Sequence, residues 1–475
     1  MVLPVILFIV VLAVVLGVVV WFLCVGRGGV SVAGVPDLGF GVYDIFGGYK
    51  RMCGFEARGF FYVVEADGVW WLVDPLGCVF ISKGVNHVDP RGDYSPRLGY
   101  SPYERNVLAK YGGFEAWLNT TVYRLLVWGF NTVGSWSYRE LYRNMPYTRN
   151  LNVMASYGFD WVTGKVPDIF DEKFEEHVVK LVRKECASRV RDPLLLGYFL
   201  DNELKWGPDW RSPKHLLDHF MELPAGSPGK RAAVNALLEA AGGSLEKVSS
   251  VLGAEVSSVD GLLSYRGGLP EHPLVSEARR VFLRMFAERY FNISVSAVRS
   301  VDPNHLILGV RFAGLPPDDV LVIAGRYVDV VTLNFYTNDP PVEALERAFE
   351  LSGRPLMVTE FSFKAMDSGL PNTKGAGQPV HTQRERAYLA ARFVLKIVEL
   401  PYVVGYHWFQ YSDQPAEGRF DGENSNFGLV NIRDEPWDLL TRVFAKVNRW
   451  VENVHGRGAG ADELLREVSE IVKKG

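Results

Sequence analysis

The sequence has few cysteines and no cluster of basic residues. Only four cysteines occur among 475 residues, and none belongs to a Cys-x-x-Cys motif, so a redox motif, a zinc ribbon or a disulfide-rich scaffold is excluded. The net charge is −4 and no stripe of Lys and Arg forms, which argues against nucleic acid as a partner. Hydrophobic residues make up 48% and charged residues 22%, the balance of a chain that folds.

Charge is also missing from the N-terminus. No charged residue occurs from Val2 to Val25, and at about 1.5 Å per residue this run can cross a hydrocarbon core about 30 Å thick. A cleaved secretory signal is the alternative, but its basic leading region is absent. We therefore expect residues 1–26 to form a single-pass membrane anchor with the rest of the chain outside the cytoplasm. Cys53 and Cys78 could pair in that compartment; two buried thiols are the alternative.

Glycine-rich residues 27–50 predict a linker, and 51–455 predict one large domain. Asp67-Gly68 separates two apolar runs, which is typical of a β-hairpin. Beyond it, short apolar runs alternate with helical patterns. The expected strands are 79–88, 131–136, 152–157, 194–200, 306–312, 328–336, 355–361 and 403–411, and the expected helices are 103–129, 171–190, 274–301, 341–352 and 383–400.

Eight strands with helical crossovers predict an α/β fold, a (β/α)₈ TIM barrel. An open doubly wound sheet would share much of this pattern, but no G-x-G-x-x-G follows the first strand. The fourth and fifth strands are about 100 residues apart, so 205–305 predicts an excursion over the barrel, with helices at 231–241 and 244–252. Residues 456–475 predict a peripheral helix.

Two expected strands carry a glutamate at or just beyond the apolar run. Glu203 follows the fourth strand in Asp201-Asn202-Glu203, and Glu360 lies near the end of the seventh. In a barrel these positions meet at the C-terminal face, where active sites form. Retaining glycosidases need two carboxyl groups about 5–5.5 Å apart. The pair predicts this chemistry, with an ionised Glu360 raising the pKa of a protonated Glu203.

The motif Asn202-Glu203 with Glu360 resembles clan A glycoside hydrolases, the 4/7 superfamily. The stretch His407-Trp408-Phe409-Gln410 and the loop after it are similar to β-agarases and β-galactosidase-like enzymes. The resemblance implies that Glu203 is the general acid/base and Glu360 the nucleophile. It also implies that Asn202 binds the sugar 2-hydroxyl, that Tyr336 orients the nucleophile, and that Trp408 forms the floor of the site.

Other residues close neighbouring strands and are expected at the same mouth. The candidates for substrate binding are Asn86, His87, Trp136 and Arg311. A helical pair, His215 and His219, has zinc-ligand spacing but lacks the glutamate that a zincin needs, so we predict no metal and no cofactor.

The sequence thus predicts a membrane-tethered retaining glycoside hydrolase that cleaves β-glycosidic bonds of a poly- or oligosaccharide. A non-catalytic carbohydrate-binding protein and a transglycosylase are the alternatives. The sugar, the linkage, endo or exo action and the oligomeric state do not follow from these residues.

Overall fold

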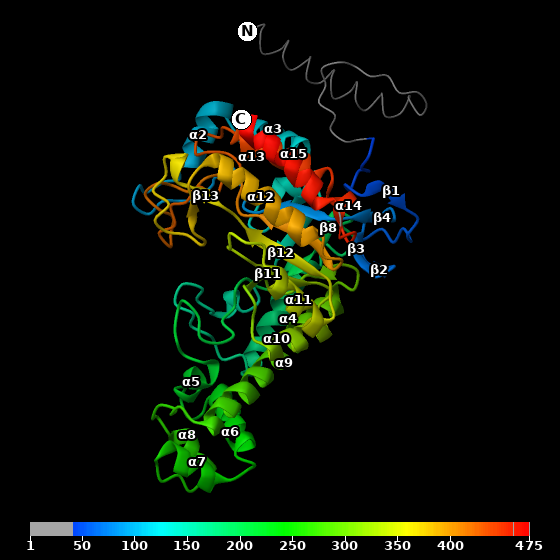
Figure 1. Ribbon diagram of the computed structural model, residues 1–475. Coiled ribbons are helices and arrows are strands. Elements are labelled where there is room, and N and C mark those ends of the chain that lie inside the picture. Colours follow the sequence, from blue (N-terminus) through cyan, green and yellow to red (C-terminus); the bar gives the residue numbers. More distant parts are fainter. Residues whose placement is uncertain (1–40, 459, 475) are drawn as a thin grey trace. The chain divides into compact units, whose positions relative to one another are not determined.

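The computed structural model describes residues 41–458 and 460–474 (Figure 1). The expected membrane anchor, 1–26, and most of the expected linker lie outside these residues. In the described part of the chain, no helix combines the length and the apolar character needed to cross a bilayer.

A small antiparallel sheet precedes the main one. Its strands, in the order β1-β4-β3-β2, are β1 (Tyr49–Cys53), β4 (Cys78–Phe80), β3 (Val69–Val73) and β2 (Tyr62–Ala66). Asp67 and Gly68 both have positive φ, 52° and 76°, as the tight turn between β2 and β3 requires. The expected hairpin is therefore confirmed, and the expected linker ends earlier than predicted because β1 already begins at Tyr49.

The main sheet is parallel and curls back on itself. Its strand order is β10-β11-β12-β15-β5-β6-β7-β8-β9, and the pairs are all parallel. The strands are β5 (Ser82–Val85), β6 (Thr132–Val133), β7 (Tyr147–Asn150), β8 (Leu195–Phe199), β9 (Leu306–Ile307), β10 (Phe312–Ala313), β11 (Val331–Asn334), β12 (Leu356–Phe361) and β15 (Val403–Trp408).

One continuous segment, 306–313, joins the two ends of this sheet. Its first part, β9, pairs with β8, and its last part, β10, pairs with β11. Between them the backbone N–H of Leu200 donates to the carbonyl of Gly309 at 2.8 Å. The sheet therefore has the curled, barrel-like form that the sequence predicted.

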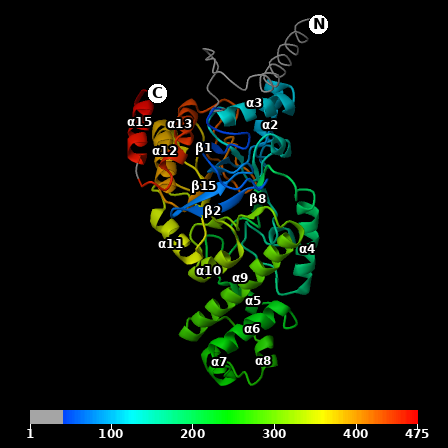
Figure 2. The ribbon, with the colours of Figure 1, turned by 90° about the vertical axis from the view of Figure 1, so that its right-hand side faces the viewer.

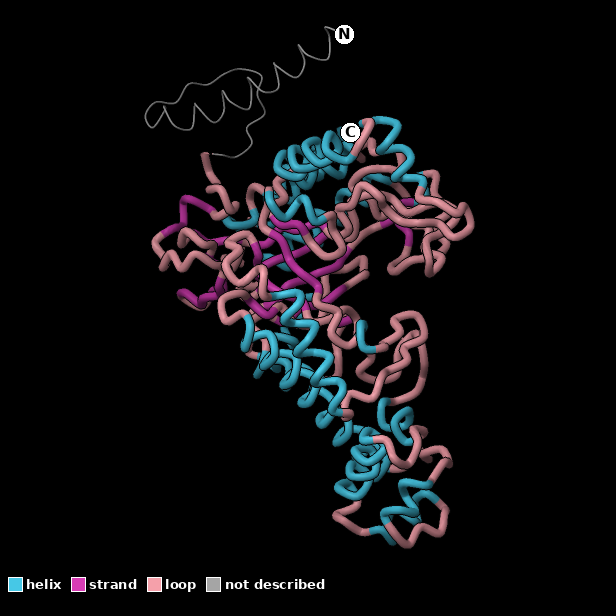
Figure 3. The backbone as a smooth tube through the Cα atoms, turned by 180° about the vertical axis from the view of Figure 1, so that it is seen from behind, coloured by secondary structure: helices cyan, strands magenta, loops and turns pink. Residues whose placement is uncertain are grey.

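Helices lie on both sides of the strands (Figure 3). They are α2 (Pro102–Tyr111), α3 (Phe114–Val127), α4 (Glu172–Cys186), α10 (Asp318–Tyr327), α11 (Val342–Ser352), α12 (Gln383–Val398), α13 (Asp438–Asn448), α14 (Val451–Val454) and α15 (Ala461–Lys474). Helix α4 illustrates the pattern: the Asp171 side chain caps its N-terminus, and four residues spaced by four are buried, namely Phe174, Val178, Val182 and Cys186.

Smaller elements lie in the connections. They are the 3₁₀ helices η1 (Arg139–Arg143), η2 (Ala155–Tyr157) and η3 (Met366–Ser368), and the two-stranded sheet of β13 (Lys364–Ala365) and β14 (Pro379–Val380).

Several sequence predictions differ from the structure, among them the first strand, 79–88, whose residues divide between β4 of the small sheet and β5 of the main sheet. The third strand is β7, Tyr147–Asn150, and the predicted strand 152–157 instead contains η2. The sequence of β7, Tyr-Thr-Arg-Asn, is mostly polar, although most of its residues are buried. Its hydrophobicity therefore did not indicate a strand. The predicted helix 103–129 is two helices, because Gly112, with φ of 70°, ends α2 in a left-handed cap.

The excursion between β8 and β9 is helical (Figure 2). It consists of α5 (Leu216–Met221), α6 (Pro228–Ala240), α7 (Leu245–Leu252), α8 (Val259–Ser264) and the 29-residue α9 (Pro273–Val301). Helix α9 packs against α5 and α6 and also against α4 and α10. It therefore connects the excursion to the helices around the sheet.

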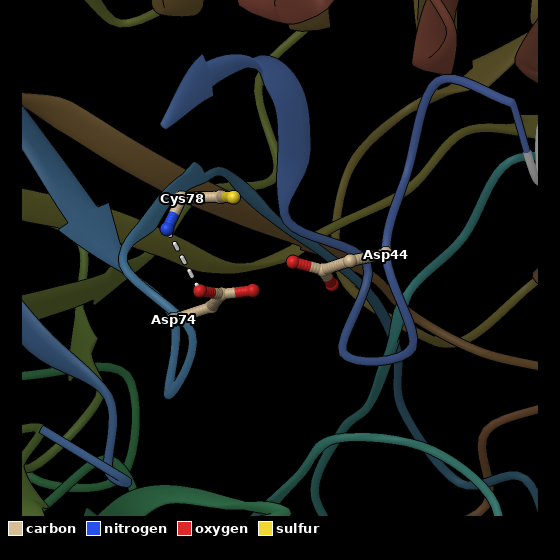
Figure 4. Close-up of side chains that lie close together, drawn as sticks. All are labelled: Asp44, Asp74 and Cys78. Atoms are coloured by element: carbon tan, nitrogen blue, oxygen red, sulfur yellow. Dashed lines mark hydrogen bonds between the residues drawn. The ribbon is translucent and has the colours of Figure 1, made fainter. Parts of the chain in front are cut away.

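Two carboxyl groups face each other beneath the small sheet (Figure 4). The Asp44 Oδ1 atom accepts the N–H groups of Phe46 and Gly48, and the Asp74 Oδ1 atom accepts those of Leu76 and Cys78. Both Oδ2 atoms are buried without a hydrogen-bond partner. Burial, with the Asp44 carboxyl adding to it, raises the pKa of Asp74 to about 7.

Cys78 lies within reach of both carboxyl groups, but its sulfur is bonded to Cys53. Of the two alternatives that the sequence left open for these cysteines, the structure has the disulfide. A disulfide sulfur carries no thiolate to bind a metal, which leaves two facing carboxyl groups with room for a shared proton.

We expect Asp74→Asn to make stability less dependent on pH. The folded-state pKa of about 7 lies above the unfolded value of about 3.9, so wild-type stability should fall as pH rises through that window. The amide keeps the oxygen that accepts two N–H groups and donates to Asp44. The free energy of unfolding of the variant should exceed that of wild type by about 1–2 kcal/mol at pH 8 and by little at pH 4.

Urea unfolding at both pH values measures this difference. Asp67→Asn, in the exposed hairpin turn, is the control. An equal change at both pH values would contradict the shared-proton account.

Candidate active site

Asn334 links the strand that carries Glu360 to the Glu203 side chain. Asn334, the last residue of β11, is the register partner of Glu360 in β12. Its Nδ2 atom donates to Glu203 Oε1 at 3.0 Å. Neighbouring strands in a sheet are about 4.8 Å apart, so a residue that lies beside Glu360 in the sheet also holds the Glu203 side chain. Both glutamates are largely buried, with 9% and 5% of their surface exposed.

The Glu360 carboxylate receives one strong donor on each oxygen. Arg311 Nη2 lies 2.5 Å from Oε1, and the Tyr336 hydroxyl lies 2.5 Å from Oε2. Arg311 is itself fully buried, and its other Nη atom donates to the Ser135 hydroxyl. A carboxylate oxygen has two lone pairs, so each oxygen can keep its donor and still have one pair free. Tyr336 occupies the position that the family resemblance implied.

Electrostatics at Glu360 are set by burial and by its charged neighbours. Burial raises the pKa of Glu360 to about 7, and the charge of Glu203 adds to the increase. Arg311, Tyr336 and Arg419 oppose it. The sequence predicted no such rise for Glu360, because it did not show how deeply this carboxyl group is buried. Two facing carboxyl groups titrate as a pair.

The Glu203 side chain is held from the opposite side by a tryptophan. Trp161 Nε1 donates to Glu203 Oε2 at 3.1 Å. Arg211 fixes the backbone below, because its Nη1 atom donates to the carbonyls of Glu203 at 3.0 Å and Trp161 at 3.3 Å. Sequence reasoning missed Trp161, Arg211 and Asn334. Asn334 lies two residues before the end of the predicted strand 328–336, so a search for polar residues near that end could have found it; Trp161 lies in a long loop with no motif around it.

Asn202 lies beside Asn334. Its Oδ1 atom accepts from Asn334 Nδ2 at 3.3 Å, and the side chain is half-buried. Its own amide group is therefore directed by the same residue that holds Glu203.

Backbone conformation is unusual at four strand ends around the site. His87, Trp136, Glu203 and Arg311 have φ between 50° and 58°, and they are four of the eight described non-glycine residues with positive φ. Bulky residues rarely adopt this region, and each instance costs about 1–3 kcal/mol. All four were predicted site residues, so the strain and the candidate site coincide.

Two predicted site residues do not reach the carboxylates. Trp408 has no exposed surface; its Nε1 atom donates to the Phe427 carbonyl at 2.8 Å, and its ring packs on Phe444 of α13. The expectation that it forms the floor of the site is therefore corrected: the ring points toward the helices. Asn86 is also fully buried, and its Nδ2 atom donates to the carbonyls of Thr359 and Trp408. It ties strands together below the site.

His87 lies at the edge of the site. Its Nδ1 atom is 3.2 Å from Gln410 Oε1, and Gln410 Nε2 donates to Asp93 at 2.7 Å. The side chain is partly exposed, at 18%. The imidazole ring can therefore contact a ligand while its Nδ1 atom is held by Gln410.

Exposed aromatic rings surround the mouth. Among described aromatic residues with large exposure, four follow the C-terminal ends of barrel strands: Tyr94, Trp136, Trp210 and Phe420. The guanidinium of Arg311 lies 4.4 Å from the centre of the Trp136 ring, and Trp161 contacts Trp210 edge-on at 6.3 Å. Flat exposed rings beside buried carboxylates are suited to binding the apolar faces of sugars.

The loop after β15 completes this rim. Arg419 pairs with Asp421 and Glu423, each at 2.8 Å. Its guanidinium also lies 5.6 Å from the centre of the Phe409 ring, which in turn contacts Tyr336. Asp421 and Glu423 are thus engaged in holding Arg419, whose charge acts on Glu360.

Comparison with known proteins places these features in context. No family model matches the sequence. The chain is 28% identical over 480 residues to β-agarase B of Vibrio sp. (strain JT0107), covering 86% of this chain and 50% of that protein. The chain spans about half the length of the curated relatives it matches.

Solved structures agree with this similarity. The crystal structure of an agarase matches with a TM-score of 0.77 and 27% identity, covering 88% of this chain and 68% of that one. An exo-β-agarase matches with a TM-score of 0.78 and 25% identity, covering 87% and 67%. The expected similarity to β-agarases is confirmed.

Proposed function

We propose that the protein is a retaining glycoside hydrolase that cleaves β-glycosidic bonds of a polysaccharide. The observation that carries the proposal is the pair of buried carboxylates, Glu203 held by Asn334 and Glu360 held by Arg311 and Tyr336. A surface that only binds sugars has no need to desolvate two carboxyl groups. The similarity to β-agarases supports a β-linked galactan as the substrate. Because β9 and β10 lie on one segment, 306–313, the curled sheet has eight strand positions, which supports a (β/α)₈ barrel.

We assign the two carboxyl groups the roles that the resemblance to clan A glycoside hydrolases implies. Glu360 attacks the anomeric carbon while Glu203 gives its proton to the leaving oxygen, and the glycosidic bond breaks. Glu203 is then a carboxylate and takes a proton from water, whose oxygen attacks the same carbon and releases Glu360. Two inversions leave the anomeric configuration unchanged. Asn334 and Trp161 keep Glu203 oriented in both steps, and Asn202 is placed to bind the sugar 2-hydroxyl.

Replacing either glutamate should separate their roles. Glu203→Ala should lower kcat/KM on a polysaccharide by roughly 10²–10⁴-fold, because no acid assists the leaving group. It should retain cleavage of aryl β-glycosides with good leaving groups, and azide should accelerate it with a β-glycosyl azide as the product. Glu360→Ala should be inactive on both substrates, and azide should yield the α-azide.

The control for these variants is Glu417→Gln, an exposed glutamate in the loop after β15. Product anomers are followed by NMR, and retained folding by thermal unfolding. Full activity in a properly folded Glu360→Ala protein would refute the assignment. Sugar binding without any bond cleavage by wild type would favour a non-catalytic binding protein, and transfer to sugar acceptors in place of water would favour a transglycosylase.

The charge of Arg311 should set the acid limb of the pH profile. Because Arg311 opposes the rise in the pKa of Glu360, Arg311→Gln should raise that pKa further. Glu360 must be ionised to attack, so the acid limb of kcat/KM should move to higher pH, by about one unit or more. Arg311→Lys keeps the charge and should move the limb less. An unchanged acid limb in a folded Arg311→Gln protein would show that the pair does not control ionisation.

We also propose that residues 1–26 anchor the protein in a membrane, with residues 51–455 outside the cytoplasm. The uncharged run from Val2 to Val25 supports the anchor. The disulfide between Cys53 and Cys78 supports an oxidising compartment.

Carbonate extraction of membranes tests the anchor. The full chain should stay in the membrane pellet and be cleaved by protease added from outside. Leu12→Arg with Val15→Arg should release it, since each central charge costs about 2.5–3.5 kcal/mol, whereas Leu12→Ile should not. Release of the unaltered chain by carbonate would count against the anchor.

A further inference from the structure

A small recess lined by lysines lies between the segment that follows Glu203 and the loop that contains Trp161. Its volume is about 150 Å³, and its walls include Lys165, Lys205 and Lys214 together with the hydroxyl-bearing residues Thr163 and Ser212. Among the described residues that line it, none is acidic. A concave site with three amines and no carboxylate attracts anions.

The walls of the recess come from two segments that also hold Glu203. One wall is the chain just beyond β8, where Lys205 comes two residues after Glu203. The other belongs to the turn from Asp160 to Lys165, which contains Trp161, the tryptophan that donates to Glu203. Arg211 ties the two walls, because it donates to the backbone carbonyls of both Glu203 and Trp161. The recess is therefore built as part of the same framework that holds the proposed acid.

Lys205 is a buried cation whose charge is only partly offset. The residue is 4% exposed, and its Nζ atom donates to the Ser212 carbonyl at 2.7 Å and lies 3.4 Å from Asp209. Asp209 is already engaged by Arg211, which donates to its Oδ2 atom from two nitrogens at 2.6 and 3.0 Å. Burial lowers the pKa of Lys205, as expected of an amine that would gain from an anionic partner.

The two other lysines are available to a ligand. Lys214 pairs with Glu222 at 2.6 Å, but both side chains are at least half exposed, so the pair contributes little and can open. Lys165 is exposed, and the acid nearest to it, Asp160, is held by the Thr163 hydroxyl and two backbone N–H groups. Charge-assisted hydrogen bonds to an oxyanion are about twice as strong as neutral ones.

We propose that this recess binds an oxyanion, a sulfate ester or a carboxylate, carried by the polysaccharide that Glu203 and Glu360 cleave. The inference rests on the proposed function and narrows its substrate class to an anionic β-linked glycan. Since Glu203 protonates the leaving oxygen, the oxyanion belongs to the leaving-group part of the chain. Neutral stretches of the same glycan are cleaved less efficiently because they bring no negative charge to the three amines.

The test compares two β-linked galactan oligosaccharides of equal length, one neutral and one carrying a sulfate ester. Wild-type kcat/KM should be higher for the sulfated one, and Lys165→Ala with Lys214→Ala should reduce this preference by roughly tenfold. Lys165→Glu should reduce it further. Lys180→Ala, an exposed lysine on α4, is the matched control and should leave the preference intact. Lys205 is left in place because its amine also holds the Ser212 turn.

Binding to an inactive protein separates this proposal from the catalytic one. In a Glu360→Gln background, calorimetry should show tighter binding of the sulfated oligosaccharide, and the double lysine variant should lose that difference. Inorganic sulfate should compete with the sulfated ligand more than with the neutral one. If wild type cleaves neither oligosaccharide, the proposed hydrolase function fails, while a lysine-dependent difference in binding still supports the recess. Equal binding of both ligands, or a preference unchanged in the double lysine variant, would overturn the oxyanion site.

Discussion

The contact between Arg311 and Glu360 depends on the way the sheet closes. Segment 306–313 pairs with β8 at its start and with β11 at its end, and Arg311 lies between the two pairings. Its guanidinium reaches the Ser135 hydroxyl beyond β6 and the Thr359 carbonyl and Glu360 carboxylate of β12, while its own carbonyl accepts the N–H of Glu203. One residue therefore touches the surroundings of both proposed catalytic groups. A buried ion pair adds little net stability because both charges lose their water. Its contribution here is to fix the orientation and ionisation of Glu360.

Much of the fold could be predicted because parallel strands buried on both faces are recorded in the sequence as short apolar runs. The glutamates stood out because they come directly after or within such runs. Strand β7 could not be found this way, because Thr148 and Asn150 are buried although they are polar and the strand therefore has no apolar run. Asn334 and Trp161 act on Glu203 from a neighbouring strand and from a distant loop. Such contacts depend on which strands and loops become neighbours in the fold, and no spacing in the sequence predicts these neighbours.

Trp408 and Trp136 show a second reason why the sequence could not predict the whole site. Side chains alternate between the two faces of a strand, so sequence alone indicates that His407 and Trp408 point in opposite directions, but not which of them points inward. In the structure His407 lies inside, 2.8 Å from the Ser82 hydroxyl, and Trp408 packs on α13. Trp136 reaches the mouth for a different reason. Its positive φ turns the chain at the end of β6 and leaves 40% of the residue exposed next to Arg311.

Positive φ at four strand ends implies that the site is shaped before any ligand binds. A residue in this conformation costs about 1–3 kcal/mol, so such residues persist only where packing around them leaves no alternative. Here the strands below are buried, and backbone hydrogen bonds hold the turns: His87 donates to the Ser135 carbonyl at 2.7 Å, and Glu203 donates to that of Arg311 at 3.1 Å. The strained residues thus hold one another in place across neighbouring strands. A carboxylate fixed in this way undergoes little reorganisation when charge develops on the sugar, and preorganisation of that kind is a large part of catalysis by electrostatic stabilisation. The stability of the barrel core is therefore what allows the mouth to keep a conformation that an isolated strand end would not adopt.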